Sequence, residues 1–297
     1  MTERKKASDF PKEVLALFDG YVHGFIERRD FLTGAAKVMG SGAAALAVLK
    51  ALKPTYAWAE QVSRDDPGIR AEYVEYPSPN GSGTMRGYMA IPEGATGPLP
   101  AVLVIHENRG LNPYIEDVVR RFAAANFVAL GSDALTPLGG YPGNDDEGRV
   151  LQRQMDGGVM MEDWVAAFQF LRDHSSTTGR VGAIGFCYGG GVVNNLAVRL
   201  PDLGAGAPFY GSAPDDEDVA SIQAPLMIHY GGLDERVNAG WPDFMAALDA
   251  AGKEYTMHMY EDANHGFHND TTPRFDEEAA RLAQDRTIAF FNEKLRG

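Results

Sequence analysis

The sequence predicts an α/β fold in which helices cover both faces of a mainly parallel central sheet. Two observations lead to this prediction. Short apolar runs alternate with segments of helical periodicity from residue 101 to the C-terminus. The run at 101–107 is continuously apolar until its end, as expected for a strand buried on both faces. With 297 residues, 44% of them hydrophobic, the chain can form a sizeable core, and we expect one α/β domain over residues 60–297.

The first elements of this domain form an edge of the sheet. Residues 71–76 and 84–92 alternate polar and apolar residues around a loop rich in Pro, Asn and Gly, which predicts an antiparallel pair. The buried strand 101–107 follows. Asn112 and Pro113 then mark the start of a helix, because asparagine caps helices and proline suits the first helical position.

The rest of the chain continues the alternation of strand and helix. Residues 134–148 are rich in Gly, Pro and Asp, which predicts a loop. The other predicted strands are 127–133, 180–186, 204–211, 224–232 and 253–261. The other predicted helices are 158–174, 188–200, 239–251 and 275–295.

Charge and cysteine content exclude several function classes. A net charge of −14 makes nucleic acid or an anionic membrane surface an improbable partner. A single cysteine excludes an intrachain disulfide framework and a multi-cysteine metal site. We expect no metal and no cofactor. The acidic runs 145–147 and 215–218 are expected to be solvated loops.

The N-terminal 59 residues differ in kind from the rest. Arg28 and Arg29, followed by Phe31 and Leu32, precede a weakly apolar Gly/Ala-rich run over 34–52, and 57–59 form an A-x-A pattern. These features are typical of a twin-arginine signal peptide. They predict that residues 1–59 are a leader recognised by the twin-arginine export machinery, which places the protein in the periplasm or outside the cell.

A second interpretation of this segment stays open. The stretch ahead of the arginines is long for a leader, and residues 11–26 have the pattern of an amphipathic helix. On this interpretation residues 11–52 form two helices packed on the main domain of a cytoplasmic protein. Neither interpretation predicts a lasting membrane span, because Lys37 and the sequence Gly-Ser-Gly at 40–42 interrupt the apolar run.

The only cysteine lies between a predicted strand and a predicted helix. Gly185, Cys187 and Gly189 follow the pattern G-x-S-x-G, with cysteine in the place of serine. Such a turn lifts a nucleophile out of the sheet and places it at a helix N-terminus, where a thiolate is favoured. A buried structural cysteine is the alternative, but the glycines and the strand–turn–helix context favour a nucleophile.

Two further residues complete a possible triad. Asp234 follows the strand 224–232 and His265 follows the strand 253–261, so both lie in loops at carboxyl ends of strands. Their order after the nucleophile is the one used by strand-end triads of this kind. The rival base His106 precedes the cysteine in the chain, and the rival acid Asp262 is too near His265 in sequence to support it easily.

The motifs "VIHENRG", "GFCYGG", "GGLDERV" and "DANHGF" together resemble the dienelactone hydrolase family, over roughly residues 70–297. The resemblance implies an α/β-hydrolase fold, a triad of Cys187, His265 and Asp234, and a Glu107 that contacts the resting thiol and helps to activate it. We expect the main-chain N–H groups of Tyr188 and Asn108 to form the oxyanion hole.

These residues predict a thiol-dependent hydrolase that cleaves an ester or lactone through an acyl-cysteine. Three arginines, Arg109, Arg149 and Arg153, are candidates for binding a substrate carboxylate, and each has a surface position as its alternative. Asn269 stands about where the family has an arginine, and Arg274 lies further on. The other functions left open are a catalytically silent binding protein and an acyltransferase or C–C hydrolase that uses the same triad.

Overall fold

The computed structural model describes residues 5–56 and 60–297 and contains an eight-stranded sheet in the order β1-β2-β4-β3-β5-β6-β7-β8. β1 pairs with β2 and β2 with β4 in antiparallel fashion, and all other pairs are parallel. The predicted fold class is thereby confirmed. The strands are β1 (Ile69–Ser78), β2 (Gly83–Pro92), β3 (Leu99–Ile105), β4 (Val128–Ser132), β5 (Thr177–Phe186), β6 (Ala205–Phe209), β7 (Leu226–Gly231) and β8 (Tyr255–Tyr260).

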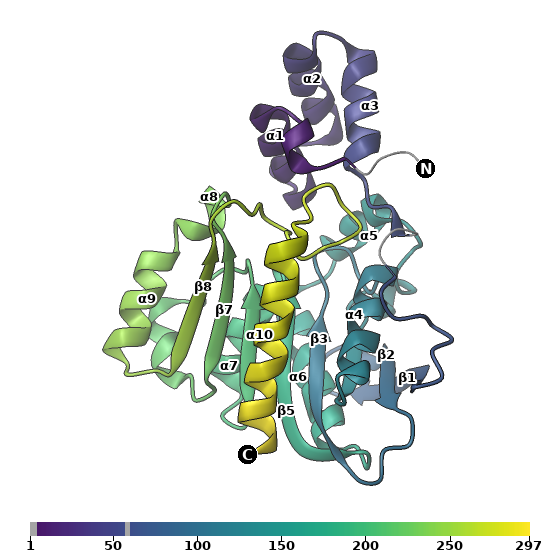
Figure 1. Cartoon of the computed structure of the whole chain (residues 1–297), viewed down its shortest axis with the longest axis vertical. Helices are drawn as coiled ribbons and strands as arrows, with labels where there is room; N and C mark the ends of the chain where they lie inside the picture. The colour runs from purple at the N-terminus through teal and green to yellow at the C-terminus, as the bar shows by residue number, and fades with distance from the viewer. Residues whose placement is uncertain (1–4, 57–59) are drawn as a thin grey trace.

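Helices cover both faces of this sheet (Figure 1). α4 (Pro113–Ala124) and α10 (Glu277–Arg296) pack on one face, where Phe122 and Phe291 belong to one apolar core. α6 (Gly157–Asp173), α7 (Tyr188–Arg199) and α9 (Trp241–Ala250) pack on the other, where Trp164 and Leu196 belong to a second core. Two cores on two faces are the arrangement that continuously apolar strands require.

Capping residues define where the helices begin. Asn112 accepts a 3.2 Å hydrogen bond from the N–H of Ile115 and Pro113 opens α4, as the sequence predicts. In the predicted loop 134–148 the structure has instead the start of α5 (Asp145–Gln152), capped by Asn144. The acidic run 145–147 is therefore not a solvated loop. It is the first turn of a helix, where acidic side chains are favoured, and Asp145 is buried.

After a short 3-10 helix at Ala7–Asp9, the described N-terminal residues form three α-helices, which we call the N-terminal unit: α1 (Lys12–His23), α2 (Arg28–Met39) and α3 (Gly42–Leu52). The unit has an apolar core of its own, built around Phe18 and Phe31. It lies over the end of the sheet from which the loop between β8 and α10 leaves β8 (Figure 1). The second interpretation predicts two helices here, and the structure has three because Gly40 in a left-handed conformation (φ 80°) ends α2 and Ser41 caps α3.

The export of the protein stays a prediction. Arg28 and Arg29 open α2, and the Ala57–Ala59 cleavage pattern lies outside the described residues. Within the described part of the chain no single helix is long and apolar enough to span a membrane. α2 and α3 reach that length and composition only as a pair bent by 114°.

Candidate active site

The sheet reverses its winding direction at β3. Chain order runs from β3 outward to β4 on one side and then to β5 on the other. Loops after the carboxyl ends of such neighbouring strands diverge, and ligands bind in the crevice between them. Asn108 follows β3 and Cys187 follows β5, so both lie at this point.

Cys187 sits on a sharp turn between β5 and α7. Its φ of 56° and ψ of −113° are unusual for a residue with a side chain, and its N–H donates a 3.0 Å hydrogen bond to the carbonyl of Phe209. The flanking glycines are required by close approach. A Cβ on Gly185 would lie 2.1 Å from the carbonyl oxygen of Gly189, and one on Gly189 would lie 2.4 Å from that of Ile105. The turn therefore has the geometry that the sequence pattern predicts.

Asp234 and His265 are brought together as expected. Nδ1 of His265 lies 2.5 Å from Oδ2 of Asp234, and both side chains are buried. The other oxygen of Asp234 accepts from the N–H of Val237, which makes Asp234 the cap of the short helix α8 (Glu235–Asn238). The carboxylate is thus held by a helix end and fixes the orientation of the imidazole.

A second histidine, in the segment 1–59 that is predicted to be a leader, contacts the cysteine. Nε2 of His23, the last residue of α1, lies 3.3 Å from Sγ of Cys187. Nδ1 of the same ring lies 2.8 Å from the carbonyl oxygen of Asp19 and 3.2 Å from its carboxylate. The rings of His23 and His265 meet edge to face with centroids 4.8 Å apart.

The electrostatics of the cluster favour a thiolate. Burial by itself raises the pKa of the Cys187 thiol, but His23 and His265 hold it well below its usual value. Burial lowers the pKa of His265, and Cys187 together with Asp234 raises it above the ordinary value. For His23 the opposing effects of burial and of Cys187 and Asp19 give a pKa of about 9. Burial raises the pKa of Asp234, but the bond to His265 lowers it overall.

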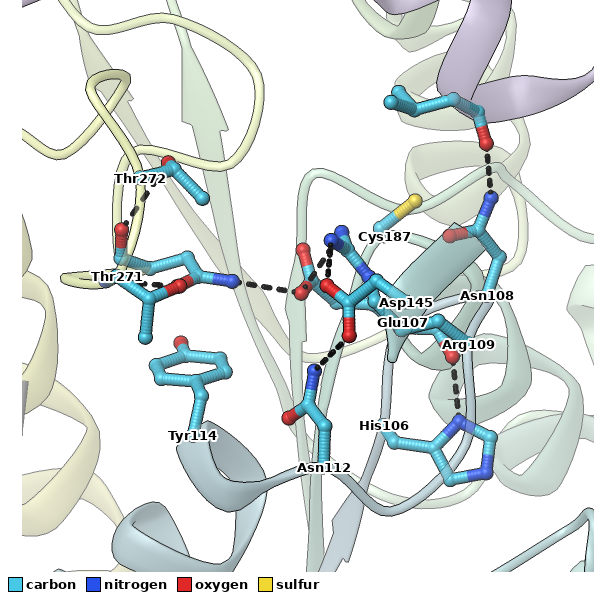
Figure 2. Close-up of polar contacts among 12 residues, drawn as sticks. His106, Glu107, Asn108, Arg109, Asn112, Tyr114, Asp145, Cys187, Thr271 and Thr272 are labelled. Atoms are coloured by element: carbon cyan, nitrogen blue, oxygen red, sulfur yellow. Dashed lines mark hydrogen bonds and ion pairs between the residues drawn. The ribbon is translucent and has the colours of Figure 1, made fainter. Parts of the chain in front are cut away.

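Glu107 is not where the resemblance places it relative to the thiol. Its carboxylate is 1% exposed and lies 3.0 Å from Nη2 of Arg109, and it accepts a 2.8 Å hydrogen bond from Asn269. Within the described residues it has no hydrogen bond to Cys187, and no dashed line joins the two in Figure 2. The thiol is hydrogen-bonded to His23 and has His265 beside it. The difference arises because Asn269 and Arg109 together bind Glu107 in the interior.

The three arginines predicted to bind a substrate carboxylate have other neighbours. Arg109 is buried, and its second guanidinium nitrogen lies 2.9 Å from Asp145, so both ends of the fork are in use (Figure 2). Arg149 is also buried, pairs with Asp146 and lies over the ring of Tyr21 in the N-terminal unit. Arg153 is exposed and lies beside Gly24 of the same unit. Among the described residues none of the three guanidinium groups has a hydrogen bond to Cys187.

The structure also shows the surroundings of the two main-chain N–H groups predicted for the oxyanion hole and of the rival base His106. Among the described residues the main-chain N–H groups of Tyr188 and Asn108 donate no hydrogen bond, so both are available donors beside the nucleophile. The side chain of Asn108 donates to the carbonyl of Val22 in α1 (Figure 2). The rival base His106 is fully buried and uses Nδ1 and Nε2 on the main chain of Glu107 and Ala134, so it has a structural role.

Sequence reasoning missed three residues of this cluster: Asp19, His23 and Arg236. Arg236 lies in the motif that supplied Asp234, and its guanidinium is 3.2 Å from Asp19 and 3.4 Å from Nδ1 of His265. The sequence signal for His23 was its place directly before Gly24, a helix-ending glycine, but nothing in the pattern places that helix end over Cys187. One ring nitrogen from each histidine and Sγ lie within 4.8 Å of one another, and these are donor types that also bind zinc.

Comparison with known proteins identifies the family. The model of the dienelactone hydrolase family matches residues 85–295. The chain belongs to the dienelactone hydrolase family. A second model, described as YqhI-like, matches residues 1–38 of this family member, which include Asp19 and His23.

Several relatives of this member of the dienelactone hydrolase family carry the names of hydrolases. A Methylorubrum extorquens protein provisionally named a carboxymethylenebutenolidase is 30% identical over 78% of this chain and 84% of its own length. A Bradyrhizobium protein provisionally named a 2-oxo-3-(5-oxofuran-2-ylidene)propanoate lactonase is 30% identical over 71% of this chain and 90% of its own. A hydrolase fragment from Escherichia coli K12 is 61% identical over 38% of this chain and 96% of its own. These matches confirm the predicted enzyme class, a hydrolase.

Solved structures agree on the fold. The dienelactone hydrolase-like phosphotriesterase P91 from metagenomic libraries superposes with a TM-score of 0.67 at 24% identity, covering 76% of this chain and 99% of its own. A thermostable esterase from Pseudomonas putida superposes with a TM-score of 0.64 at 14% identity, covering 96% of this chain and 97% of its own. The likeness shows an α/β-hydrolase fold.

Proposed function

We propose that the protein hydrolyses a carboxylic ester or lactone through a covalent acyl-cysteine on Cys187. The observation that supports this best is the position of the sulfur. Cys187 lies on a positive-φ turn at a helix N-terminus and beside the Asp234–His265 pair. A nucleophile, a base and a group that orients the base are the three parts that acyl transfer requires.

The proposed reaction has two halves. The Cys187 thiolate attacks the carbonyl carbon, a C–S bond forms, and the oxygen becomes an oxyanion that the N–H groups of Tyr188 and Asn108 stabilise. The C–O bond then breaks, the departing alcohol oxygen takes a proton from an imidazolium, and the acyl group stays on sulfur. In the second half neutral His265 removes a proton from water as the water attacks the acyl carbon. The C–S bond breaks and the thiolate is restored.

The substrate that fits best is an ester or lactone with little negative charge. Two of the three arginines predicted to bind a carboxylate, Arg109 and Arg149, are already paired with carboxylates, and the chain has a net charge of −14. An anionic dienelactone would have to displace an existing ion pair to gain either of them as a cationic partner. We expect p-nitrophenyl acetate to be hydrolysed with a higher kcat/KM than a dienelactone that carries a free carboxylate.

Replacement of the nucleophile tests the proposal. Wild type, Cys187→Ala and Cys187→Ser are assayed on both substrates, and mass spectrometry of acid-quenched wild type looks for the acyl adduct. We expect an adduct on wild type and the loss of hydrolysis in Cys187→Ala. Equal turnover by wild type and Cys187→Ala would reject the cysteine mechanism. An adduct that is released only to an added alcohol or amine would show a transferase instead.

A further inference from the structure

His23 makes the same kind of contact with the nucleophile as a triad histidine. Its Nε2 atom is 3.3 Å from Sγ of Cys187, and its Nδ1 atom faces Asp19. The proposed base His265 likewise has Nδ1 on an acid, Asp234. Two Asp–His pairs, one from α1 and one from the loops after β7 and β8, therefore converge on one sulfur.

The two imidazoles are not in equivalent positions. Nε2 of His265 is buried and has no hydrogen-bond partner among the described residues, whereas Nε2 of His23 is hydrogen-bonded to Sγ. Since a thiol has one proton, only one ring can take it. Nε2 of His23 is the ring nitrogen within hydrogen-bond distance of Sγ, so the geometry favours His23 for that proton, while a ring nitrogen of His265 lies within 4.8 Å of the same sulfur and can act on water once the sulfur is acylated.

The charged groups around His23 come from several elements. Asp19 lies on the same helix, one turn earlier, and is bound by Arg236 of α8 at 3.2 Å and by Arg274 of the loop before α10 at 3.4 Å. Arg236 also lies 3.2 Å from Nε2 of His23, which opposes protonation of the ring. The carboxylate of Asp19 and a thiolate at Cys187 favour protonation, and the pKa of His23 is about 9 as a result.

The contact depends on how the N-terminal unit docks. The unit has its own apolar core, separate from the two cores of the main domain. Its contacts with the main domain are largely polar and ionic: Lys53 and Tyr21 on Asp146, the carbonyl of Val22 on Asn108, and Asp19 on Arg236 and Arg274. Polar interfaces of this kind hold separable parts of a chain. With the unit docked, Cys187 is only 9% exposed and His23 lies against its sulfur.

We propose that His23 is a catalytic residue, contributed by the N-terminal unit, that takes the proton of Cys187 and holds the sulfur as a thiolate in the resting enzyme. This inference rests on the proposed function of Cys187. The proton moves from Sγ to Nε2 of His23, and the resulting imidazolium is balanced by Asp19. No bond to carbon forms in this step, and nothing is oxidised. The thiolate is therefore formed before substrate arrives, and the working enzyme needs residues 12–23.

The ultraviolet absorbance of the thiolate tests this directly, because the chain has one cysteine. The full chain is titrated as wild type, His23→Ala, Asp19→Asn and Glu13→Gln, and the absorbance of Cys187→Ala is subtracted. Glu13 is an exposed residue at the other end of α1 and serves as the control. We expect the titration midpoint to rise from well below the ordinary thiol value to above about pH 7 in His23→Ala, since a midpoint about one unit above the assay pH is a tenfold loss of thiolate. Asp19→Asn should give a smaller rise and Glu13→Gln none.

The same variants are assayed for ester hydrolysis against pH. We expect kcat/KM of His23→Ala at pH 7 to fall on the order of 10- to 100-fold, and to recover as the pH passes the new midpoint. Far-ultraviolet circular dichroism confirms that the variants are folded. A merely structural role would lower kcat/KM at every pH without recovery.

The possible failures are distinguishable. An unchanged midpoint in His23→Ala overturns this inference, and so does a higher kcat/KM at every pH, which would mean that His23 only obstructs the site. Both results leave the proposed function intact if Cys187→Ala is inactive. If Cys187→Ala is active, the proposed function itself fails, whatever His23 does.

Discussion

The side-chain amide of Asn269 donates a hydrogen bond of 2.8 Å to Oε2 of Glu107. The same oxygen lies 3.0 Å from Arg109, and Arg109 in turn binds Asp145. Oε2 of the buried carboxylate is thus bound by two partners, Asn269 and Arg109. Its contribution is expected to be to the stability of this loop, which carries the predicted oxyanion donor Asn108.

Glu107→Gln tests this assignment. Removal of the charge leaves buried Arg109 with one carboxylate fewer, and we expect the free energy of unfolding to fall by about 3 kcal/mol, measured by urea denaturation. The midpoint of the thiolate titration should change by less than about one pH unit. The exposed Glu72→Gln is the control. A fall of the thiol pKa by well over a unit would contradict this assignment and restore the contact that the family resemblance implies.

Asp234→Asn tests the orientation of His265. An asparagine can still cap α8 but cannot hold the imidazole with Nδ1 protonated, so we expect kcat/KM to fall on the order of 10²- to 10⁴-fold with little change in thermal stability. The measurement is hydrolysis of p-nitrophenyl acetate together with a melting curve. Asp262→Asn, which changes the exposed rival acid, should leave kcat/KM within about twofold of wild type. The reverse ranking would assign the acid to Asp262.

Much of the fold could be predicted because its signals are local. All eight strands lie where apolar runs or alternation predict them, and the elbow at Cys187 follows from glycine spacing and the strand–turn–helix order. The helix α5 was missed because its first turn is acidic and follows Gly and Pro, a composition that also describes a loop. Its three acids suit a helix N-terminus only once the helix exists.

The site was predicted less completely, because long-range placement leaves no local signal. Asp234 and His265 could be found from chain order and strand ends, but His23 is 164 positions from Cys187 and on a separately cored unit. The partner of Glu107 is similar: Asn269 was seen as a departure from the family, but not as the donor that binds this carboxylate. Ion-pair choices among buried groups depend on packing that the sequence pattern does not state.

Gly189→Ala tests the turn itself. A Cβ at this position would lie 2.4 Å from the carbonyl oxygen of Ile105 and 2.7 Å from that of His106, and backbone atoms cannot give way as a flexible side chain can. We expect a loss of more than about 100-fold in kcat/KM or a protein that fails to fold, since a shift of about 1 Å at the nucleophile is enough for this. Gly97→Ala, where a Cβ meets no atom within 4 Å, should match wild type in activity and melting temperature. A fully active Gly189→Ala enzyme would show that the elbow is not strained by close approach.

The twin-arginine prediction has a test that also bears on His23. The pair Arg28–Arg29 predicts export, so replacing both by lysine should retain the protein in the cytoplasm of a host with this pathway. The contact of His23 predicts in addition that the active enzyme keeps residues 12–23. Mass spectrometry of the active fraction from each compartment measures both. An intact chain confined to the cytoplasm in wild type would contradict export, and an active enzyme beginning after Ala59 would contradict the role of His23.

His268 predicts how stability depends on pH. The ring is buried between Tyr114, which is 2.7 Å from Nδ1, and Gln284, and burial lowers its pKa from 6.5 to about 3. Between these two values the unfolded chain binds one proton more than the folded chain. Its stabilising contribution is therefore present above pH 6.5 and is lost as the pH falls toward 3, by about 1.4 kcal/mol per pH unit. Urea denaturation between pH 4 and pH 6 measures this slope.

We expect the slope to fall by about 1.4 kcal/mol per pH unit in His268→Gln, whatever the absolute stability of that variant. Tyr114→Phe removes the hydrogen bond to Nδ1 but keeps the titrating ring, so it should be less stable with nearly the wild-type slope. The pKa of buried His229 is also lowered by burial, so part of the dependence of unfolding free energy on pH remains in every variant. Parallel curves for wild type and His268→Gln would mean that His268 is not held neutral in the folded state.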